Sequence, residues 1–215
     1  MYVVGINGSP RKRHNTATLV QDALRGAESK GAQTELFNLC DLSFSGCKSC
    51  FACKRIDAGS FGRCALSDGL SDVLDRMLAA DAIVIGSPVY FIDVTSSVRA
   101  LEERLLFPTV LYSVSGELAR SKRVPTGLIF TMNEPHPESD PAFRSLFELQ
   151  KRFFDELVGD TLMLLSTDTL QYDDYSLYVG EIFDAEAKLH RHNTVFREDR
   201  NRAFDMGVRL LESIE

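Results

Sequence analysis

The chain has 215 residues, of which 44% are apolar and 26% charged, and its formal net charge is −7. This length and composition predict a soluble globular protein with one domain, and they exclude a disordered or fibrous chain. The excess of acidic residues argues against nucleic acid and anionic membranes as partners, because both are bound mainly through Lys and Arg. The sequence shows neither a signal peptide nor an apolar run that could span a membrane, so we expect a cytoplasmic protein.

Apolar runs alternate with helical patterns along the chain. A β-branched run at residues 2–6 predicts a buried strand that ends at a tight loop, and apolar residues then recur at helical spacing from Thr16 to Gly31. Further strands are expected at residues 33–39, 81–88, 126–132 and 160–166, and further helices at 68–80, 95–107, 141–157 and 183–214. Five strands that alternate with helices predict an α/β fold in which helices cover both faces of a parallel sheet.

The loop after the first strand has the features of an anion site. It follows a strand, contains Gly8, and leads into a helix whose N-terminal N–H groups attract a phosphate. Residues 11–14 form a basic cluster in an acidic chain, and hydroxyl or amide donors come from Ser9, Asn15, Thr16 and Thr18. Neither the P-loop pattern nor the Rossmann glycine pattern occurs there, so we expect a phosphate site of another kind.

Three motifs stand out in the first part of the chain. They are Gly8-Ser9-Pro10-Arg11 followed by Asn15-Thr16, Cys47-x2-Cys50-x2-Cys53, and Ser87-Pro88-Val89-Tyr90-Phe91. Together they resemble the NADPH-dependent FMN reductase and iron-sulfur flavoprotein family, over roughly residues 2–132. The resemblance implies a flavodoxin-like three-layer sandwich with a five-stranded parallel sheet. We expect residues 1–215 to form one such FMN-binding domain, with a cysteine-rich loop at 40–66 and a C-terminal helical extension at 183–214.

The resemblance also implies which residues bind FMN. In that family the loop after the first strand holds the FMN phosphate, which implies this role for Ser9, Arg11, Asn15, Thr16 and Thr18. The segment after the third strand lies beside the isoalloxazine ring, which implies flavin contacts for Pro88, Val89, Tyr90 and Phe91. The fourth strand ends in the same crevice, so we expect its last residues to face the other edge of the flavin, through Thr131 and Asn133.

All five cysteines fall between residues 40 and 64, which indicates cofactor or redox chemistry rather than a disulfide framework. Cys47, Cys50 and Cys53, with Cys64 as fourth ligand, have a spacing that lets thiolates converge on a 4Fe-4S cluster, although the gap before Cys64 is longer than is usual in iron-sulfur flavoproteins. The same thiolates suit a structural zinc ion, and free thiols are the third alternative. Cys40 ends a strand and is predicted to be a buried apolar residue.

The function implied by the resemblance is that of an FMN-dependent NAD(P)H oxidoreductase, which passes electrons from a nicotinamide donor to a quinone, a flavin or a similar acceptor. The four histidines are scattered and no catalytic triad pattern stands out, so we expect no dedicated acid or base. The alternatives are an electron carrier that takes electrons from ferredoxin, and a non-catalytic flavin-binding or anion-binding regulator. By analogy with related proteins we expect a homodimer or homotetramer, with the tyrosine-rich segment 168–180 over a ligand or at a subunit interface.

Overall fold

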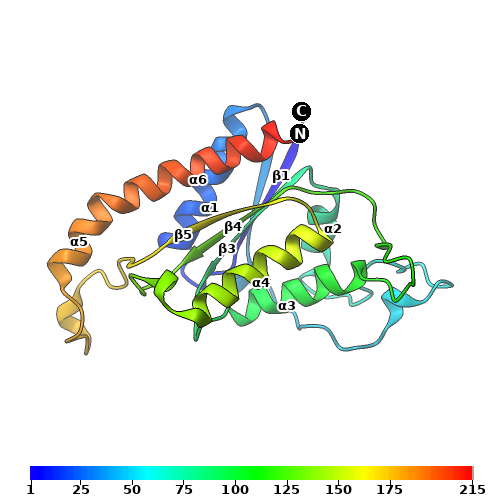
Figure 1. Cartoon of the computed structure of the whole chain (residues 1–215), viewed down its shortest axis with the longest axis horizontal. Helices are drawn as coiled ribbons and strands as arrows, with labels where there is room; N and C mark the ends of the chain where they lie inside the picture. Colours follow the sequence, from blue (N-terminus) through cyan, green and yellow to red (C-terminus); the bar gives the residue numbers. More distant parts are fainter. Residues whose placement is uncertain (215) are drawn as a thin grey trace.

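The central sheet consists of five parallel strands, seen in the computed structural model of the chain, which describes residues 1–214 (Figure 1). The strands are β1 (Tyr2–Asn7), β2 (Gln33–Asn38), β3 (Ala82–Pro88), β4 (Thr126–Thr131) and β5 (Thr161–Ser166). They lie in the order β2-β1-β3-β4-β5, which is the strand order of flavodoxin-like folds. The predicted α/β fold with a five-stranded parallel sheet is therefore confirmed.

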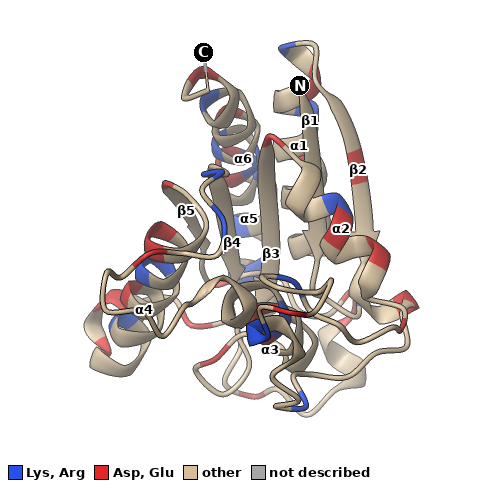
Figure 2. Ribbon diagram, turned by 90° about the vertical axis from the view of Figure 1, so that its right-hand side faces the viewer, with Lys and Arg blue, Asp and Glu red and all other residues tan. Residues whose placement is uncertain are grey.

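Six α-helices accompany the sheet in the part of the chain that the structure describes. They are α1 (Asn15–Ser29), α2 (Ser71–Ala79), α3 (Ser96–Leu106), α4 (Pro141–Leu157), α5 (Ala185–Asn193) and α6 (Val195–Glu212). Helices α2, α3 and α4 cover one face of the sheet, and α1 and α6 cover the other (Figures 1 and 2). No helix within residues 1–214 combines the length and apolarity that a membrane span requires.

Strand β3 explains why the core has two layers. Its residues alternate in direction, so Ile83 and Ile85 join the layer under α2, α3 and α4, whereas Ala82 and Val84 join the layer under α1 and α6. Both layers exclude solvent, and the strand is therefore apolar on both faces. This double burial is the reason that the run at residues 81–88 reads as a continuous apolar stretch rather than an alternating one.

Helix α6 packs on α1 with its backbone in direct contact. A Cβ atom at Gly207 would lie 1.8 Å from the carbonyl oxygen of Ala23, and a Cβ atom at Gly26 would lie 2.0 Å from that of Phe204. Beside this contact, Arg200 Nε donates to Asp22 Oδ2 at 2.7 Å. The helical residues predicted at 183–214 form two helices, and α6 forms half of one face of the sandwich.

The contact at Gly207 yields a stability prediction. A Gly-to-Ala change in an exposed helix stabilises a protein by about 1 kcal/mol, whereas an added methyl group that meets fixed backbone costs about 1–3 kcal/mol. We therefore expect Gly207→Ala to lower the free energy of unfolding by about 1–3 kcal/mol in urea titrations. Gly59→Ala is the control, since a Cβ atom there meets nothing within 4 Å. A Gly207→Ala protein as stable as the parent would contradict the close packing of α6 on α1.

Candidate functional site

The C-terminal ends of β1, β3 and β4 meet at the edge of the sheet where the strand order reverses. Helix α1 leaves β1 toward one face and α3 leaves β3 toward the other, so the two loops diverge and leave a crevice. A cavity of about 210 Å³ lies there, and it is lined by Ser9, Arg11, His14, Asn15, Thr16, Pro88, Val89, Tyr90, Thr131, Met132, Asn133, Thr169, Leu170 and Gln171. The structure thus brings all of the predicted flavin-binding residues together except Thr18 and Phe91.

The loop between β1 and α1 is held in place by its own side chains and by β3. Gly8 N donates to the carbonyl of Gly86 at 2.8 Å, and a Cβ atom at Gly8 would lie 2.1 Å from a methyl group of Val98, so only glycine fits at this point. The carboxamide oxygen of Asn7 accepts from Ser9 N at 3.1 Å, and the hydroxyl of Ser9 accepts from Arg11 N at 3.1 Å. These contacts fix the loop before any ligand binds.

Helix α1 begins without a side-chain cap. Its N-cap residue, His14, makes no side-chain hydrogen bond to the first turn, and that turn contains no acidic residue. By contrast, the Thr95 hydroxyl accepts from Val98 N and caps α3. The first N–H groups of a helix need a partner, and an anion supplies one favourably because the helix dipole is positive at this end. With the cavity in front of it, the uncapped start of α1 fits a phosphate group.

The opposite end of the cavity is formed by the residues that follow β3 and β4. Val89 N donates to the carbonyl of Thr131 at 2.9 Å, which keeps the two chain segments side by side beyond the regular strands. The hydroxyl of Thr131 in turn lies 2.7 Å from that of Thr16, and both residues are buried. This hydroxyl pair joins the loop end of the cavity to the strand-end side.

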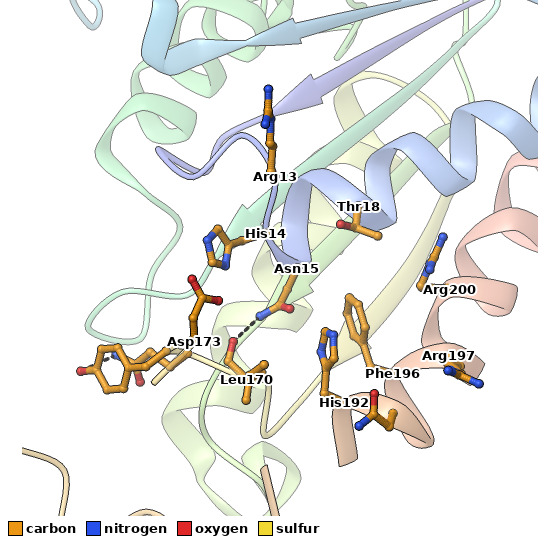
Figure 3. Close-up of a pocket in the computed structure, with 13 residues that line it drawn as sticks. Arg13, His14, Asn15, Thr18, Leu170, Asp173, His192, Phe196, Arg197 and Arg200 are labelled. Atoms are coloured by element: carbon orange, nitrogen blue, oxygen red, sulfur yellow. Dashed lines mark hydrogen bonds between the residues drawn. The ribbon is translucent and has the colours of Figure 1, made fainter. Parts of the chain in front are cut away.

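Two predicted flavin-binding residues lie outside the cavity. Thr18 lies one turn after the N-cap residue His14 on α1 and lines a neighbouring cavity instead (Figure 3). Phe91 is fully exposed, and with Ile92 it forms a tight turn in which both residues have positive φ, 51° and 57°. The turn is closed by two backbone hydrogen bonds between Tyr90 and Asp93. The sequence prediction missed this turn because Phe and Ile rarely adopt the left-handed conformation that it requires.

A segment of residues 168–173, here called the strap, follows β5 and lies against the loop before α1. Asn15 Nδ2 donates to the carbonyl of Leu170 at 2.8 Å, and the Arg11 guanidinium donates to the carbonyl of Gln171. The hydroxyl of Thr169 donates to the carbonyl of Met132 at 3.1 Å. Arg11 and Asn15 therefore reach the cavity as predicted, but in this structure their side chains bind the strap.

Lys188 of α5 connects the strap to the strand-end side of the cavity. Its side chain is buried, and its ammonium group donates to Asn133 and pairs with Asp168. The sequence prediction missed Lys188 as well as three strap residues that line the cavity, Thr169, Leu170 and Gln171. Its one signal was the polar, aromatic composition of residues 168–180, which indicated a loop over a ligand or an interface.

The family of the chain follows from comparison with known proteins. The family model described as NADPH-dependent FMN reductase matches residues 1–120. The chain belongs to this family. Residues 1–120 supply β1 to β3 and the loop before α1, whereas Thr131, Asn133 and the strap come from the part of this FMN reductase family member that the match does not cover.

The individual proteins to which this FMN reductase family member is similar are sequence relatives and solved structures with a similar fold. Iron-sulfur flavoproteins from Methanocaldococcus jannaschii and Methanosarcina thermophila are 38% and 32% identical over 104 residues, which is 48% of this chain and 51% and 52% of those proteins. The chain thus matches only about half the length of these relatives. Among solved structures, an azoreductase from Bacillus anthracis has a TM-score of 0.68 at 10% identity, with 97% of this chain and 99% of that chain covered. An NAD(P)H:quinone oxidoreductase from Methanothermobacter marburgensis has a TM-score of 0.64 at 12% identity and 98% and 96% coverage, and both structures support the fold alone.

The cysteine loop of this FMN reductase family member does not form the predicted metal site. Cys47 and Cys50 are exposed, Cys64 is half-buried, and Cys53 is buried. All four line a cavity of about 20 Å³, which has room for about one water molecule and not for an iron-sulfur cube. Among residues 1–214, no group of three or more His, Cys, Asp or Glu side chains is arranged to hold a metal ion. The structure therefore supports neither the 4Fe-4S nor the zinc interpretation.

Cys40 is exposed, so the prediction of a buried residue is wrong. The regular strand β2 ends at Asn38, and Cys40 lies in a single turn of 3-10 helix at Leu39–Asp41. In this turn the buried apolar position is taken by Leu39. The chain thus leaves the strand direction at Leu39, one residue before Cys40. Cys40 therefore does not take the buried position that an extended strand would have given it.

Arg104 of α3 holds the cysteine loop in this arrangement. Its side chain is fully buried and pairs with Asp68 at 2.7 Å, and it also donates to the carbonyls of Ser45 and Leu66 and to Cys64 Sγ at 3.3 Å. Asp68 additionally accepts from Leu70 N at 3.0 Å, so α2 begins at Ser71 rather than at residue 68. One buried guanidinium thus joins both ends of the loop to the core.

A second buried network lies beneath the turn at Tyr90–Asp93. Arg99 donates to Glu102 at 2.6 Å and pairs with Asp93, so it links the turn to α3. The Glu102 side chain is only 3% exposed. Burial raises the pKa of Glu102 from 4.5 to about 7, although the charge of Arg99 and a hydrogen bond from Gln150 act to lower it. Glu102 is therefore protonated in a large share of folded molecules below neutral pH.

This pKa shift makes the stability of the chain pH-dependent. Between pH 4.5 and about 7 the folded chain binds more protons at Glu102 than the unfolded chain does, so this contribution to stability is present in acid and is lost as the pH rises through about 7. We expect Glu102→Gln to gain stability relative to the parent, by up to about 3 kcal/mol, between about pH 5 and pH 8. Urea unfolding at several pH values measures this difference. Exposed Glu148→Gln on α4 is the control, and a pH-independent difference for Glu102→Gln would refute the assignment.

Proposed function

We propose that this chain is an FMN-dependent oxidoreductase that takes electrons from NAD(P)H and passes them to a quinone, a flavin or a similar small acceptor. The observation that carries the proposal is the uncapped N-terminus of α1 at the head of a cavity that extends to the residues after β3 and β4. A phosphate at one end and a flat ring at the other would use both features. Membership in the FMN reductase family supports the same cofactor.

The phosphate end of the proposed site rests on the loop and the first turn of α1. Ser9 and Thr16 supply hydroxyl groups, and the free N–H groups of the helix supply the main anion contacts. Arg11 and Asn15 would exchange their hydrogen bonds to the strap for contacts with the phosphate, and a charge-assisted contact from Arg11 is the stronger of the two. The loop itself needs no rearrangement, because Asn7 and Ser9 already fix it.

The ring end of the proposed site is formed by Pro88, Val89, Tyr90, Thr131 and Asn133. When bound, FMN supplies the redox chemistry, because its ring accepts a hydride and releases electrons to an acceptor. The ends of β3 and β4 would hold the edge of the ring, and the apolar residues after β3 would exclude water from one of its sides. Lys188 fixes the orientation of the Asn133 carboxamide, which would face the ring.

A further cavity adjoins the ring end of the site and has room for a small planar donor or acceptor. It has a volume of about 520 Å³, shares Asn133 with the flavin cavity, and is otherwise lined by Glu134, Pro135, Asp168, Ile182, Phe183, Asp184, Ala187 and Lys188. Its wall combines the aromatic ring of Phe183 and three aliphatic residues with five polar or charged ones, and its volume is within the range of sites for small organic molecules. We place the nicotinamide and the acceptor there in turn.

We extend the proposal to the organisation of the protein. Residues 1–215 act as one binding domain, since the strap and α6 complete the region that the first 120 residues begin. The chain acts as a homodimer or homotetramer, and this part rests on exposed apolar side chains in the turn after β3 and in the segment before α5, namely Phe91, Ile92, Leu177, Val179 and Ile182. Sedimentation of the purified protein tests it, and a monomer at all concentrations would overturn this part alone.

Mutation of the phosphate end tests the cofactor assignment. Arg11→Ala removes a charge-assisted contact worth about 1.5–3 kcal/mol, so we expect FMN to bind roughly 10–150 times more weakly in a fluorescence titration. Lys12→Ala is the matched control, because Lys12 lies in the same loop but pairs with Asp41 outside the cavity. The parent protein with FMN should be bleached by NADPH or NADH without oxygen. A parent protein that binds no FMN would end the proposal.

The names of the iron-sulfur flavoprotein relatives favour a second candidate function, an electron carrier that takes electrons from a protein such as ferredoxin. The two candidates differ in which donor reduces the bound flavin. Bleaching by reduced ferredoxin and not by NAD(P)H would favour the carrier, and bleaching by NAD(P)H favours the oxidoreductase. Iron and sulfide assays on protein purified without oxygen test the cysteine loop separately.

A further inference from the structure

A second large cavity lies on the other side of the N-terminus of α1 (Figure 3). Its volume is about 520 Å³, within the range of pockets that hold small molecules. Three parts of the chain meet there, namely the start of α1, the strap, and the junction of α5 and α6. The family match ends at residue 120, so two of these three parts lie outside it. We call this space the α6 cavity.

The α6 cavity adjoins the proposed phosphate end of the flavin cavity. The two cavities share His14, Asn15, Leu170 and Gln171, which belong to the loop, the first turn of α1 and the strap. None of the ring-end residues, from Pro88 to Tyr90 or from Thr131 to Asn133, lines the α6 cavity. An occupant of the α6 cavity would therefore lie next to the phosphate of a bound flavin and away from its ring.

The lining of the α6 cavity carries an excess of positive charge in a chain whose net charge is −7. Arg13, Arg197 and Arg200 contribute guanidinium groups, and Asp173 is the one carboxylate of the lining. Asp22 pairs with Arg200, whereas Arg13 and Arg197 form no ion pair within residues 1–214. Figure 3 shows the side chains of Arg13 and Arg197 extending outward from the rim. Both are exposed, so they are free to turn toward an anion.

His192 shows the effect of these charges and offers a flat surface. Its pKa is lowered first by burial and then by the charges of Arg191, Arg200 and Arg197. Its Nδ1 atom is buried and has no hydrogen-bond partner among the described residues. The imidazole stacks on Phe196 with 5.0 Å between ring centroids, and together they form an aromatic wall.

We propose that the α6 cavity binds the phosphoadenosine half of a dinucleotide. The aromatic wall suits a purine base, the unpaired arginines suit a phosphate, and the shared residues make the cavity continuous with the flavin phosphate site. The proposal rests on the proposed function, because the flavin and the nicotinamide can each belong to a dinucleotide that carries this group. One is FAD in place of FMN, whose second phosphate would continue directly from the first. The other is NADPH, whose adenosine carries an additional 2′-phosphate.

Calorimetry on the FMN-loaded protein tests the site directly, with 5′-AMP and adenosine 2′,5′-bisphosphate as probes. We expect at least one probe to bind, and the double variant Arg13→Gln/Arg197→Gln to weaken that binding at least about tenfold, since two charge-assisted contacts are lost. Arg209→Gln is the matched control, because it removes the same charge from α6 but lies about 18 Å along the helix from Arg197. Failure of both probes to bind, or binding that the double variant leaves unchanged, would overturn the proposal.

Two further measurements distinguish the source of the group. If FAD is the occupant, the parent protein binds FAD more tightly than FMN, and the double variant removes this difference. If NAD(P)H is the occupant, the double variant raises the KM for NADPH by a larger factor than the KM for NADH, because only NADPH carries the additional 2′-phosphate. In both cases FMN affinity stays at the parental value, which shows that the variant is folded. If the parent protein itself binds no FMN, the result instead overturns the proposed function.

Discussion

The site depends on one constraint. Strands β1 and β3 are hydrogen-bonded to each other up to their ends, and the loops that follow them then turn to opposite faces of the sheet. Gly8 N donates to the carbonyl of Gly86 and so keeps β1 and β3 together to the edge of the sheet. Beyond this bond α1 turns to one face and α3 to the other. The free N–H groups of α1 are left in front of a crevice that no side chain fills. A side chain at Gly8 would separate this loop from Val98 and α3.

The C-terminal part of the chain partly covers this crevice. Close contact between Gly207 and Ala23 sets α6 against α1, and the position of α6 fixes the junction with α5. From α5, Lys188 holds Asp168 at the start of the strap, and the strap then meets Arg11 and Asn15. The packing of α6 on α1 thus determines how much of the loop before α1 the strap covers.

Local patterns were sufficient to predict the sheet and the loop before α1. The strand at residues 81–88 is buried on both faces, so its run of apolar residues is unambiguous. Gly8-Ser9-Pro10 interrupts the apolar pattern of the first strand, which is typical of a tight loop. Two of the predicted flavin-binding residues do not line the cavity, and the physical causes lie at single residues. Thr18 follows the donors of the first turn at helical spacing, and the rotation of the helix carries it to the α6 cavity. Phe91 follows Tyr90 directly, but a left-handed turn directs its ring into solvent.

The contacts of the strap with the loop before α1 could not be predicted, because no local pattern determines them. The strap residues bind the loop through carbonyl oxygens, and every residue type has a carbonyl group, so the sequence carries no signal of the contact. The same holds for Lys188, which a sequence pattern places on a helix surface and the fold places in a buried pair with Asp168.

The cysteine loop shows why spacing along a chain differs from spacing in space. Two residues inside the Cys47–Cys53 motif, Ser49 and Phe51, have positive φ, so the chain does bend back on itself as a cluster motif requires. The bend brings the thiols to the wall of one small cavity, but Phe51 and Phe107 contact each other there and Arg104 fixes the return segment. The volume between the thiols is therefore set by aromatic packing and a buried ion pair. A cluster would need more space between the thiols, and Arg104, which pairs with Asp68 and contacts Cys64 Sγ, holds the return segment in its present place.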